Sequence, residues 1–419
     1  MTRPAAIGLD WPLTTITGWG VVGVHLAIAM CRSPGPRPVL FRNPEMVEVD
    51  PLRRRVLAPL LKKAEEFAET FPRGQRPLVK AAFPVLHALT RKLGGQPELP
   101  AEGRPDIGLA VIEDTRLTDV GRENAKRYAR IVAASRWVAD VLRSEGVEDA
   151  AVVQQGIDPS LFHPGPQLRP FGDRFVIFSG GKIEFRKGQD LVVAAFRRFH
   201  ARHPEAFLVT CWQNAWPESA ASIVASGIAR RPPRKRDGLG IDVDEWMAGM
   251  GVPAGSCMDV DFVPNGMMPP VIREADVALF PNRCEGGTNL VAMECLAAGV
   301  PTILSANTGH LDLLAGPDVA IPLRRQRPLG SRRPAGTDDR GGAEGVAPRL
   351  HLVTSSGEPM GTDGWGESDV EEIVEALEKV HADRAGAAER AARAAAWMAS
   401  EWSWDRHVER LMAHVDAVA

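Results

Sequence analysis

The sequence predicts an α/β protein with two Rossmann-like, doubly wound parallel sheets that face one another across a cleft. Short apolar runs rich in Val, Ile and Phe alternate with longer amphipathic stretches, which is the pattern of βα units that build a parallel sheet. The alternation occurs twice, before and after a segment rich in Gly, Pro and Asp at residues 154–173. A length of 419 residues also suits two domains. Because open α/β sheets bind ligands at the carboxyl ends of their strands, we expect a site in the cleft.

The composition excludes several classes of protein. Fifty Lys and Arg residues against 53 Asp and Glu give a net charge of −3, which argues against nucleic-acid binding through bulk positive charge and against a disordered chain. The five cysteines are odd in number and form no CxxC pair, so we expect neither a disulfide framework nor a zinc knuckle, and a reducing cytoplasm is the expected compartment. We also expect no membrane-spanning segment and no secretory signal, because long apolar runs are lacking.

The first half begins with a strand and a glycine-rich loop. The strands expected in this half lie at residues 5–10, 38–41, 107–112, 131–134 and 151–154. Gly18, Gly20 and Gly23 have the GxGxxG spacing with which backbone amides approach a pyrophosphate. The first glycine lies several residues beyond the strand, and no strand-end carboxylate follows at the ribose-binding distance, so a nicotinamide cofactor is not favoured. The loop either faces the cleft or is a tight turn into a helix packed closely on the sheet.

Residues 51–95 do not fit the alternation. They contain ten basic and three acidic residues, with apolar residues between the charges. We expect a basic helical insertion, which is either a solvated helix or one that lies on anionic lipid.

Three residues of the first half are candidates for the acceptor side of the cleft. Glu113 and Asp114 follow the strand that ends at Ile112, and they either touch the ligand or form a plain turn. His87 is the third candidate; the alternative is a packed structural histidine.

The second half opens with a strand at residues 174–179 and a charged glycine turn. Further elements are expected as helices at residues 189–200 and 291–298 and as strands at residues 207–212, near residue 261, 277–280 and 302–305. Gly180 and Gly181 let backbone amides approach a ligand, and Lys182 and Lys187 can flank a diphosphate from either side. The alternative is that the charges of this turn are simply solvated.

A second loop, at residues 282–289, follows the strand at residues 277–280. Its glycine pair exposes amides, and Thr288 or Asn289 can cap the next helix, whose N-terminus suits a phosphate or a polar sugar. Glu285 and Glu294 can bind hydroxyls on two parts of one ligand, because both carboxylate oxygens accept hydrogen bonds.

Four segments together resemble the signatures of retaining glycosyltransferases of family four, which have the GT-B fold. They are IVAASRWVADVLRSEGV, VVQQGIDPSLFHP, FSGGKIEFRKGQDLVVAAF and ADVALFPNRCEGGTNLVAMECLAAGVPTI. The resemblance covers most of residues 131–314, and residues 18–23 resemble the family's N-terminal glycine loop. It implies that a hexosyl group passes from a nucleoside-diphosphate sugar to an acceptor hydroxyl with retention, without an essential metal or a cofactor. By family frequency we expect a role in cell-surface polysaccharide or glycolipid synthesis, in the cytoplasm or on the inner membrane face.

The resemblance also implies roles for the candidate residues. Lys182, where the family usually has arginine, and Lys187 would grip the diphosphate, and Glu285 would hold the transferred sugar. Glu294 would hold the ribose, and residues 263–266 would pack on the base. The implied donor-binding set is Gly18, Gly20, Gly180, Gly181, Val263, Asn265, Gly286, Gly287, Thr288, Asn289, Leu290 and Glu294.

Two features bear on activity and on metal use. Eight residues separate Glu285 from Glu294, where the family usually has seven, and this spacing is the support for an alternative interpretation as a nucleotide-sugar-binding protein without transfer activity.

The pairs Asp242/Asp244 and Asp259/Asp261 have the DxD spacing of metal-dependent transferases. The first fits a helix N-cap and the second leads into a strand, so we expect no metal site there.

The C-terminal third contains a loop and a terminal helix. Residues 324–349 are almost entirely Arg, Gly, Pro, Asp and Ala, which predicts a flexible surface loop. Trp397, Trp402 and Trp404 need an apolar surface, so the last helix should pack back on the body. The expected domains are residues 1–165, 166–385 and, for the terminal helix, 386–419.

Overall fold

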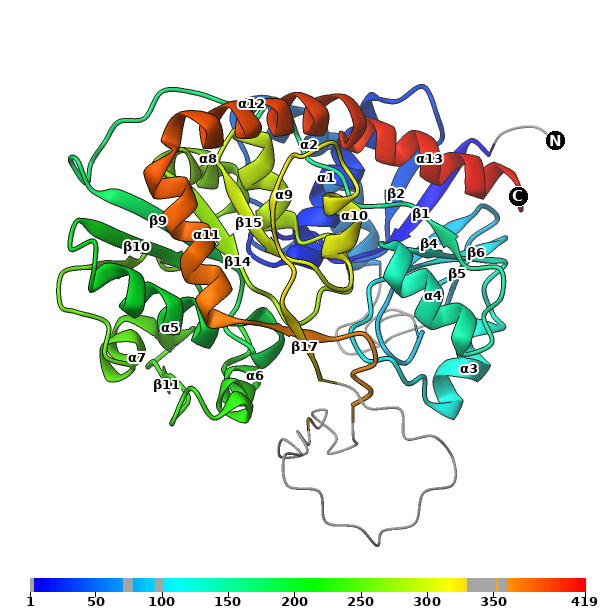
Figure 1. Cartoon of the computed structure of the whole chain (residues 1–419). Coiled ribbons are helices and arrows are strands. Elements are labelled where there is room, and N and C mark those ends of the chain that lie inside the picture. Colours follow the sequence, from blue (N-terminus) through cyan, green and yellow to red (C-terminus); the bar gives the residue numbers. More distant parts are fainter. Residues whose placement is uncertain (1–3, 71–77, 95–100, 330–351, 353–359) are drawn as a thin grey trace, which may run out of the picture.

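A computed structural model describes residues 4–70, 78–94, 101–329, 352 and 360–419. The chain forms two six-stranded sheets, one in each half, and their strands run parallel throughout (Figure 1). The predicted fold class, two Rossmann-like α/β halves, is therefore confirmed. Among the described residues, no helix combines the length and the apolarity that crossing a bilayer requires.

The N-terminal sheet has the strand order β2-β1-β4-β6-β7-β8. Its strands are β1 (Ala6–Asp10), β2 (Arg37–Leu40), β4 (Val85–Leu89), β6 (Asp106–Ala110), β7 (Arg130–Ala133) and β8 (Ala151–Val152). Its helices are α1 (Gly18–Arg32), α2 (Pro51–Glu69), α3 (Asp119–Ala125) and α4 (Arg136–Ser144). The short strands β3 (Val79–Lys80) and β5 (Ala101–Glu102) pair beside this sheet. The carboxyl ends of β1 and β6 lead into the segments that face the second half.

The prediction of a helical insertion over residues 51–95 is correct for α2 and wrong for the part that forms β4. This strand lies between β1 and β6 and is buried along its whole length. Its only polar residue is His87, whose Nδ1 lies 3.0 Å from Asp10 Oδ2 and whose Nε2 lies 2.8 Å from Asp106 Oδ1. Burial alone would lower the pKa of His87, but the two carboxylates raise it. His87 is thus a structural histidine held by the two neighbouring strands rather than a residue of the acceptor side.

The C-terminal sheet has the strand order β13-β10-β9-β14-β15-β16. Its strands are β9 (Phe175–Gly180), β10 (Ala206–Cys211), β13 (Cys257–Asp259), β14 (Val277–Phe280), β15 (Thr302–Ser305) and β16 (Ile321–Leu323). Its α-helices up to residue 314 are α5 (Gln189–His200), α6 (Pro217–Ala220), α7 (Val243–Gly249), α8 (Met268–Arg273), α9 (Leu290–Ala297) and α10 (His310–Leu314). Short 3₁₀ turns are η1 (Phe185–Lys187), η2 (Ala221–Ser226) and η3 (Asn265–Met267), and β11 (Arg234–Lys235) pairs with β12 (Ile241–Asp242). Helix α5 and strands β14 and β15 have the bounds that the sequence predicted.

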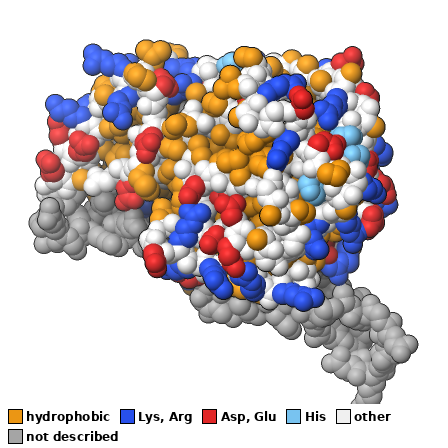
Figure 2. All heavy atoms as spheres, turned by 90° about the vertical axis from the view of Figure 1, so that its left-hand side faces the viewer, with side chains coloured by type: hydrophobic (Ala, Val, Ile, Leu, Met, Phe, Trp, Pro, Cys, Tyr) orange, Lys and Arg blue, Asp and Glu red, His pale blue; other side chains and the backbone are white. Residues whose placement is uncertain are grey.

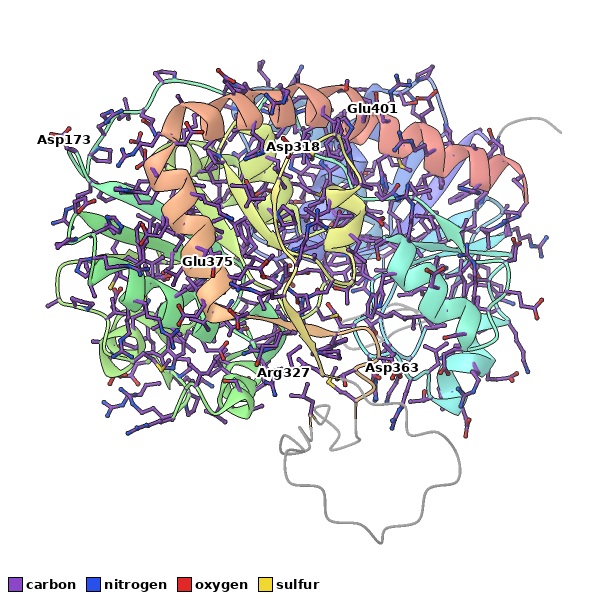
Figure 3. All side chains as sticks on the ribbon, in the orientation of Figure 1. Asp173, Asp318, Arg327, Asp363, Glu375 and Glu401 are labelled. Carbon is purple, nitrogen blue, oxygen red and sulfur yellow. The ribbon has the colours of Figure 1, made fainter. Side chains whose placement is uncertain are left out.

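The last three helices join the two halves. They are α11 (Val370–Ala382), α12 (Arg384–Glu401) and α13 (Trp404–Asp416), and the last two run across the top of the molecule in Figure 1. Met398 of α12 lies in a core that contains α9, whereas Leu411 of α13 lies in the core of the N-terminal sheet. Asp318, labelled in Figure 3, pairs with Arg390 of α12, with 3.2 Å between Oδ1 and Nε. The terminal helix therefore packs on the first domain.

The predicted loop at residues 324–349 lies largely outside the described residues. Its described beginning includes β17 (Gln326–Pro328), which pairs antiparallel with β18 (Gly366–Ser368). After this segment, Asp363 reaches the first domain, where it accepts a hydrogen bond from Thr115 with 3.3 Å between the oxygens.

Candidate functional site

The turn after β9 and the loop after β14 form one charged cluster. Both strands end at the same edge of the sheet, so the segments that follow them lie close together. Lys187 Nζ lies 2.5 Å from Glu285 Oε1, and Arg186 Nη1 lies 3.4 Å from Glu285 Oε2. All three side chains are largely buried, at 12%, 16% and 6% exposure for Lys187, Arg186 and Glu285. Two cations thus converge on one carboxylate at the carboxyl edge of the sheet.

Glu285 is held in place by both its backbone and its side chain. Its N–H donates to Thr308 Oγ1 over 2.9 Å, and its carbonyl accepts from the Gly309 N–H over 3.0 Å. Asn282 donates a side-chain hydrogen bond to Oε1. Burial alone would raise the pKa of Glu285, but Lys187 and Arg186 lower it to about 2. Glu285 is therefore an ionised carboxylate throughout the neutral range.

Arg186 connects the cluster to the first domain. Its Nε lies 2.9 Å from Glu184 Oε2, and its Nη2 lies 3.2 Å from Glu113 Oε1, which comes from the segment after β6. Arg186 was not among the site residues predicted from the sequence. The candidate Glu113 does reach the cluster.

Asp114 has a different place. It is buried, accepts from the N–H groups of Arg116 and Gly361 over 3.0 and 2.8 Å, and pairs with Arg91. These contacts fit the interpretation as a turn, and the three partners are not residues of the charged cluster.

Lys182 lies at the partly exposed edge of the same turn. Its Nζ lies 2.6 Å from Glu184 Oε1 and 5.0 Å from the centre of the Trp216 ring. Lys182 therefore pairs with Glu184, which also pairs with Arg186. The two cations that pair with Glu285 are Lys187 and Arg186. Gly181 has a φ of +105°, and a Cβ at this position would lie 3.8 Å from Lys187 Nζ, so the backbone passes close to the lysine.

A second cluster brings together the predicted ribose and base residues. Glu294 lies in α9 and is buried, and its Oε1 accepts a hydrogen bond from Asn265 Nδ2 over 2.6 Å. Burial raises the pKa of Glu294 to about 8. Asn265 Oδ1 lies 3.0 Å from Nε2 of His25 in α1. Val263 belongs to the same apolar cluster as residues of α9. Sequence reasoning missed His25, whose signal was a single histidine in an otherwise apolar helix.

The loop between the two glutamates packs on the first domain. The Gly286 carbonyl accepts from Ser135 Oγ over 2.9 Å, and a Cβ on Gly286 would lie 2.4 Å from the carbonyl oxygen of Ile112. The Thr288 N–H donates to Gln155 Oε1 over 3.2 Å, and a Cβ on Gly287 would meet the same oxygen at 2.4 Å. The Thr288 amide, which belongs to the expected donor-binding set, is thus bonded to the other domain.

The loop between the two glutamates ends at a capped helix. Asn289 has a φ of +62°, and its side chain caps α9 by accepting from the Ala292 N–H. Leu290 begins α9 and packs against the cores of both domains.

The N-terminal glycines have two different environments. Gly18 is the first residue of α1, and a Cβ there would meet nothing within 4 Å. A Cβ on Gly20 would lie 2.1 Å from Thr14 Cγ2, and one on Gly23 would lie 2.3 Å from the Pro12 carbonyl oxygen. Gly20 and Gly23 therefore allow α1 to pack closely on the end of β1, and only Gly18 of the three has open space beside it. Gly180 is also packed, because a Cβ there would meet Val291 at 2.6 Å.

A buried arginine that sequence reasoning left without a role positions the charged cluster. Arg283 is fully buried and binds Asp190 through two hydrogen bonds of 2.8 Å each. Its Nε donates to Glu367 over 2.7 Å and its Nη1 to the Phe185 carbonyl over 2.8 Å. The Arg283 N–H also donates to the Arg186 carbonyl over 2.7 Å. Arg283 therefore holds the turn after β9 against the loop that carries Glu285. Its signal in the sequence was an arginine three residues beyond the end of an apolar strand.

The two DxD pairs have structural contacts. Asp242 caps α7 by accepting from the Glu245 N–H over 3.0 Å, as predicted. Asp259 is largely buried and accepts from Thr210 and from the Trp212 N–H, and Asp261 pairs with Arg236 over 2.6 Å.

Residues 267–411 match the family described as "Family 4 Glycosyltransferase in conflict systems". This segment is therefore similar to family 4 glycosyltransferases. It contains Glu285, Glu294 and Arg283, whereas Lys182 and Lys187 precede it. No curated protein sequence matches the chain significantly.

Several solved structures resemble the whole chain and show that it has the GT-B fold. Anabaena HepE in complex with UDP and glucose matches with a TM-score of 0.59 and 12% identity, over 99% of this chain and 100% of that one. Sucrose-phosphate synthase from Thermosynechococcus elongatus matches with a TM-score of 0.58 and 14% identity, over 100% of both chains. A glycosyltransferase from Rickettsia africae matches with a TM-score of 0.59 and 9% identity, over 100% of this chain and 99% of that one.

Proposed function

We propose that the protein is a retaining hexosyltransferase that moves a sugar from a nucleoside-diphosphate sugar to an acceptor hydroxyl, in the synthesis of a cell-surface polysaccharide or glycolipid. The observation that carries this proposal is the meeting of Lys187 and Arg186 on the buried Glu285, with Glu294 in the neighbouring helix α9. The family 4 match of the second half supports it, as does the fold shared with HepE, which has been described in complex with UDP-glucose.

The cations of the turn after β9 would stabilise the departing diphosphate. One charge at about 4 Å from a phosphate is worth up to roughly 4 kcal/mol at an effective dielectric of about 20. Electrostatic stabilisation of this kind is the largest contribution that such a site can make to a transfer in which negative charge develops on the leaving group.

Binding of the diphosphate requires a rearrangement of the charged cluster. Three cations, Lys182, Arg186 and Lys187, are connected to three carboxylates, Glu113, Glu184 and Glu285. The cluster is thus balanced, and further negative charge is accommodated when Lys187 or Arg186 turns from Glu285 to the phosphates. The released carboxylate would then accept hydrogen bonds from hydroxyls of the transferred sugar. The acceptor hydroxyl would attack the anomeric carbon on the face from which the diphosphate leaves, and its proton would pass to the departing diphosphate. Attack on that face gives retention.

Glu294 and Asn265 would hold the nucleoside. The raised pKa of Glu294, about 8, keeps this carboxyl protonated at neutral pH, so that it can donate one hydrogen bond and accept another. A ribose diol offers the matching groups. Val263 and Leu290, which are partly buried, would contact the base and the sugar.

We place the acceptor beside Glu113 and, for a lipid-linked acceptor, the enzyme on an anionic membrane surface through α2. Leu52 of this helix is 81% exposed, and Arg54, Arg55, Lys62 and Lys63 are exposed as well. An exposed apolar residue among exposed cations suits the surface of such a membrane on its cytoplasmic side.

The test is a thermal-shift screen of UDP, GDP, ADP and their sugars, followed by a nucleotide-release assay with a panel of acceptors and by NMR of the product's anomeric configuration. We expect one nucleotide sugar to stabilise the protein and to release its nucleotide only when acceptor is present. Donor binding without release across the panel would favour the binding-protein alternative, and inversion at the anomeric carbon would refute retention.

A further inference from the structure

A second polar cluster lies at the opposite edge of the C-terminal sheet. Glu205 directly precedes β10, at the amino end of the strand, whereas Lys187 follows the carboxyl end of β9. His203 lies between α5 and β10, and His381 is in the last turn of α11. Figure 2 shows this side of the molecule, on which histidine side chains lie beside acidic ones. The cluster is thus separate from the proposed donor site.

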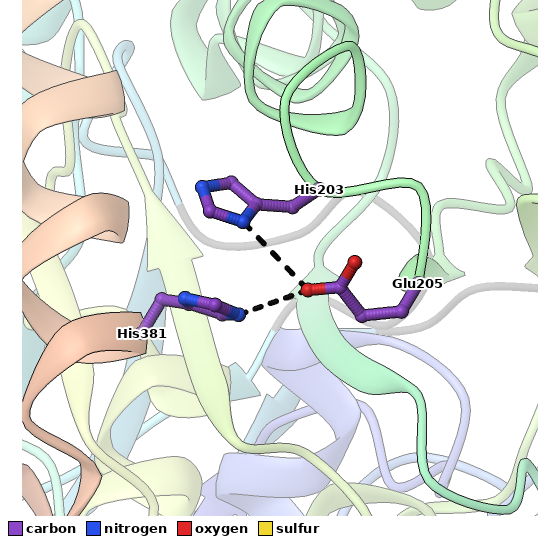
Figure 4. Close-up of side chains that lie close together, drawn as sticks. All are labelled: His203, Glu205 and His381. Carbon is purple, nitrogen blue, oxygen red and sulfur yellow. Dashed lines mark hydrogen bonds and ion pairs between the residues drawn. The ribbon is translucent and has the colours of Figure 1, made fainter.

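The three side chains have the spacing of metal ligands. His381 Nε2 lies 3.0 Å from Glu205 Oε1, and His203 Nδ1 lies 3.7 Å from the same oxygen (Figure 4). One ligand atom from each residue lies within 4.8 Å of the other two. Tetrahedral Zn²⁺ with bonds of about 2.0–2.2 Å separates its ligand atoms by about 3.3 Å. The side chains are 21%, 43% and 23% exposed for His203, Glu205 and His381, so small rotations can bring them to this spacing.

An independent contact orients His203 as a ligand. Its Nε2 lies 2.8 Å from Glu378 Oε2, and Glu378 is itself fixed by Arg202, with 2.9 Å between Nε and Oε1. Metal-bound histidines commonly donate their second ring N–H to a carboxylate in this way. With the Nε2–H given to Glu378, the neutral ring directs its Nδ1 lone pair at the Glu205 carboxylate. The Nδ1 lone pair of His203 and the Glu205 carboxylate are then two electron-pair donors that face one another. A cation between them would bind to both.

Aromatic packing restricts both rings. The His203 ring lies 4.5 Å from the ring of Phe199, and the His381 ring lies 5.0 Å from that of Phe175, in an edge-to-face arrangement. The two imidazoles are 4.2 Å apart between centres. These contacts limit the rotation of both rings, which reduces the entropy lost when a ligand is bound.

We propose that His203, Glu205 and His381 bind a Zn²⁺ ion that ties the end of α11 to the turn between α5 and β10. Two imidazoles and one carboxylate suit Zn²⁺, whereas Ca²⁺ and Mg²⁺ prefer oxygen ligands alone. The fourth position is open to water on the exposed side. Because α11 leads directly into α12 and α13, the ion would secure the segment that packs across both domains. Glu378 acts as a positioning residue for His203.

The experiment uses the full-length protein without a histidine tag, stripped of metal with a chelator. Calorimetric titration with ZnCl₂ should show one equivalent bound, and Zn²⁺ in excess should raise the melting temperature by about 3 °C or more. His381→Ala and Glu205→Gln should each weaken Zn²⁺ binding by at least about 100-fold, and Glu378→Gln by about 10-fold. Co²⁺ should give a tetrahedral visible spectrum in the wild type that His381→Ala lacks.

His163→Ala is the matched control, because His163 is an exposed histidine far from the cluster in sequence and bonded to Arg273. This variant should bind Zn²⁺ as the wild type does. Circular dichroism checks that the variants are folded, and Glu205→Gln replaces an exposed carboxylate with a group of the same shape. Wild-type protein that binds no Zn²⁺ at micromolar concentration, or a His203→Ala/His381→Ala variant with unchanged affinity, would overturn the proposal. Neither result depends on glycosyl transfer.

Discussion

The ammonium group of Lys187 lies 2.5 Å from Oε1 of Glu285, and this ion pair joins the turn after β9 to the loop after β14. Both side chains are largely buried, so neither charge is well solvated on its own. A charge left unpaired in such a place is costly. The two residues therefore depend on each other in the free protein, while the proposed function requires them to act on two different parts of the donor.

Lys187→Met should lower the affinity for the nucleotide sugar by about 100-fold, because a charge-assisted hydrogen bond to phosphate is lost. It should also destabilise the protein, because Glu285 loses its closest cation. Isothermal titration with the nucleotide sugar found in the thermal-shift screen measures the first effect, and urea unfolding measures the second. The double variant Lys187→Met/Glu285→Gln should recover stability without recovering donor binding. Unchanged donor affinity in Lys187→Met would count against the proposed role of the turn.

Arg283→Met should reduce the free energy of unfolding by about 3–5 kcal/mol, since Asp190 would remain buried without its bidentate partner. Urea denaturation gives the value. Arg198→Met is the control in the same domain: Arg198 pairs with Glu371 on the surface, at 53% and 63% exposure, and its loss should cost no more than about 1 kcal/mol. An Arg283 variant as stable as the Arg198 variant would show that the buried pair does not hold the site together.

The sequence predicted the βα units and the site loops from local patterns. The bounds of α5, β14 and β15 agree because each is an uninterrupted apolar or amphipathic run between glycines, prolines or polar residues. The helix start at Leu290 follows from the capping side chain of Asn289, a contact within four residues. Such features depend on neighbours in sequence, which is why they can be recognised there.

Features that depend on distant contacts were not predictable in the same way. Strand β4 was missed because His87 interrupts its apolar run, and the two carboxylates that make this histidine acceptable in a core come from other strands. Spacing could not show whether Lys182 or Arg186 is the second cation beside Lys187. That depends on which of them contacts Glu285, about a hundred positions away in the sequence. The contact of Gly286 with Ile112 likewise requires the two domains to be docked.

Gly286→Ala should weaken the contact between the domains, because the new Cβ would lie 2.4 Å from the carbonyl oxygen of Ile112. The clash is with backbone, so relief requires the loop or the domains to move, at a cost of about 1–3 kcal/mol in the free energy of unfolding. Chemical denaturation measures it. Gly35→Ala is the control, since its Cβ would meet only Ser33 Oγ, at 3.3 Å. Equal stability of the two variants would mean that the docked arrangement contributes little in solution.

Glu294→Gln should become progressively more stable than the wild type as the pH rises from about 5 to 8. Burial raises the pKa of Glu294 from 4.5 to about 8 in the folded protein. Between these values the unfolded chain releases the proton while the folded protein keeps it, so wild-type stability falls with rising pH, by up to about 1.4 kcal/mol per pH unit. Glutamine has no proton to lose, and every other titrating group is common to both proteins. Urea unfolding of both at pH 5, 6.5 and 8 gives the difference, and a difference that stays constant across this range would contradict the burial of a protonated Glu294.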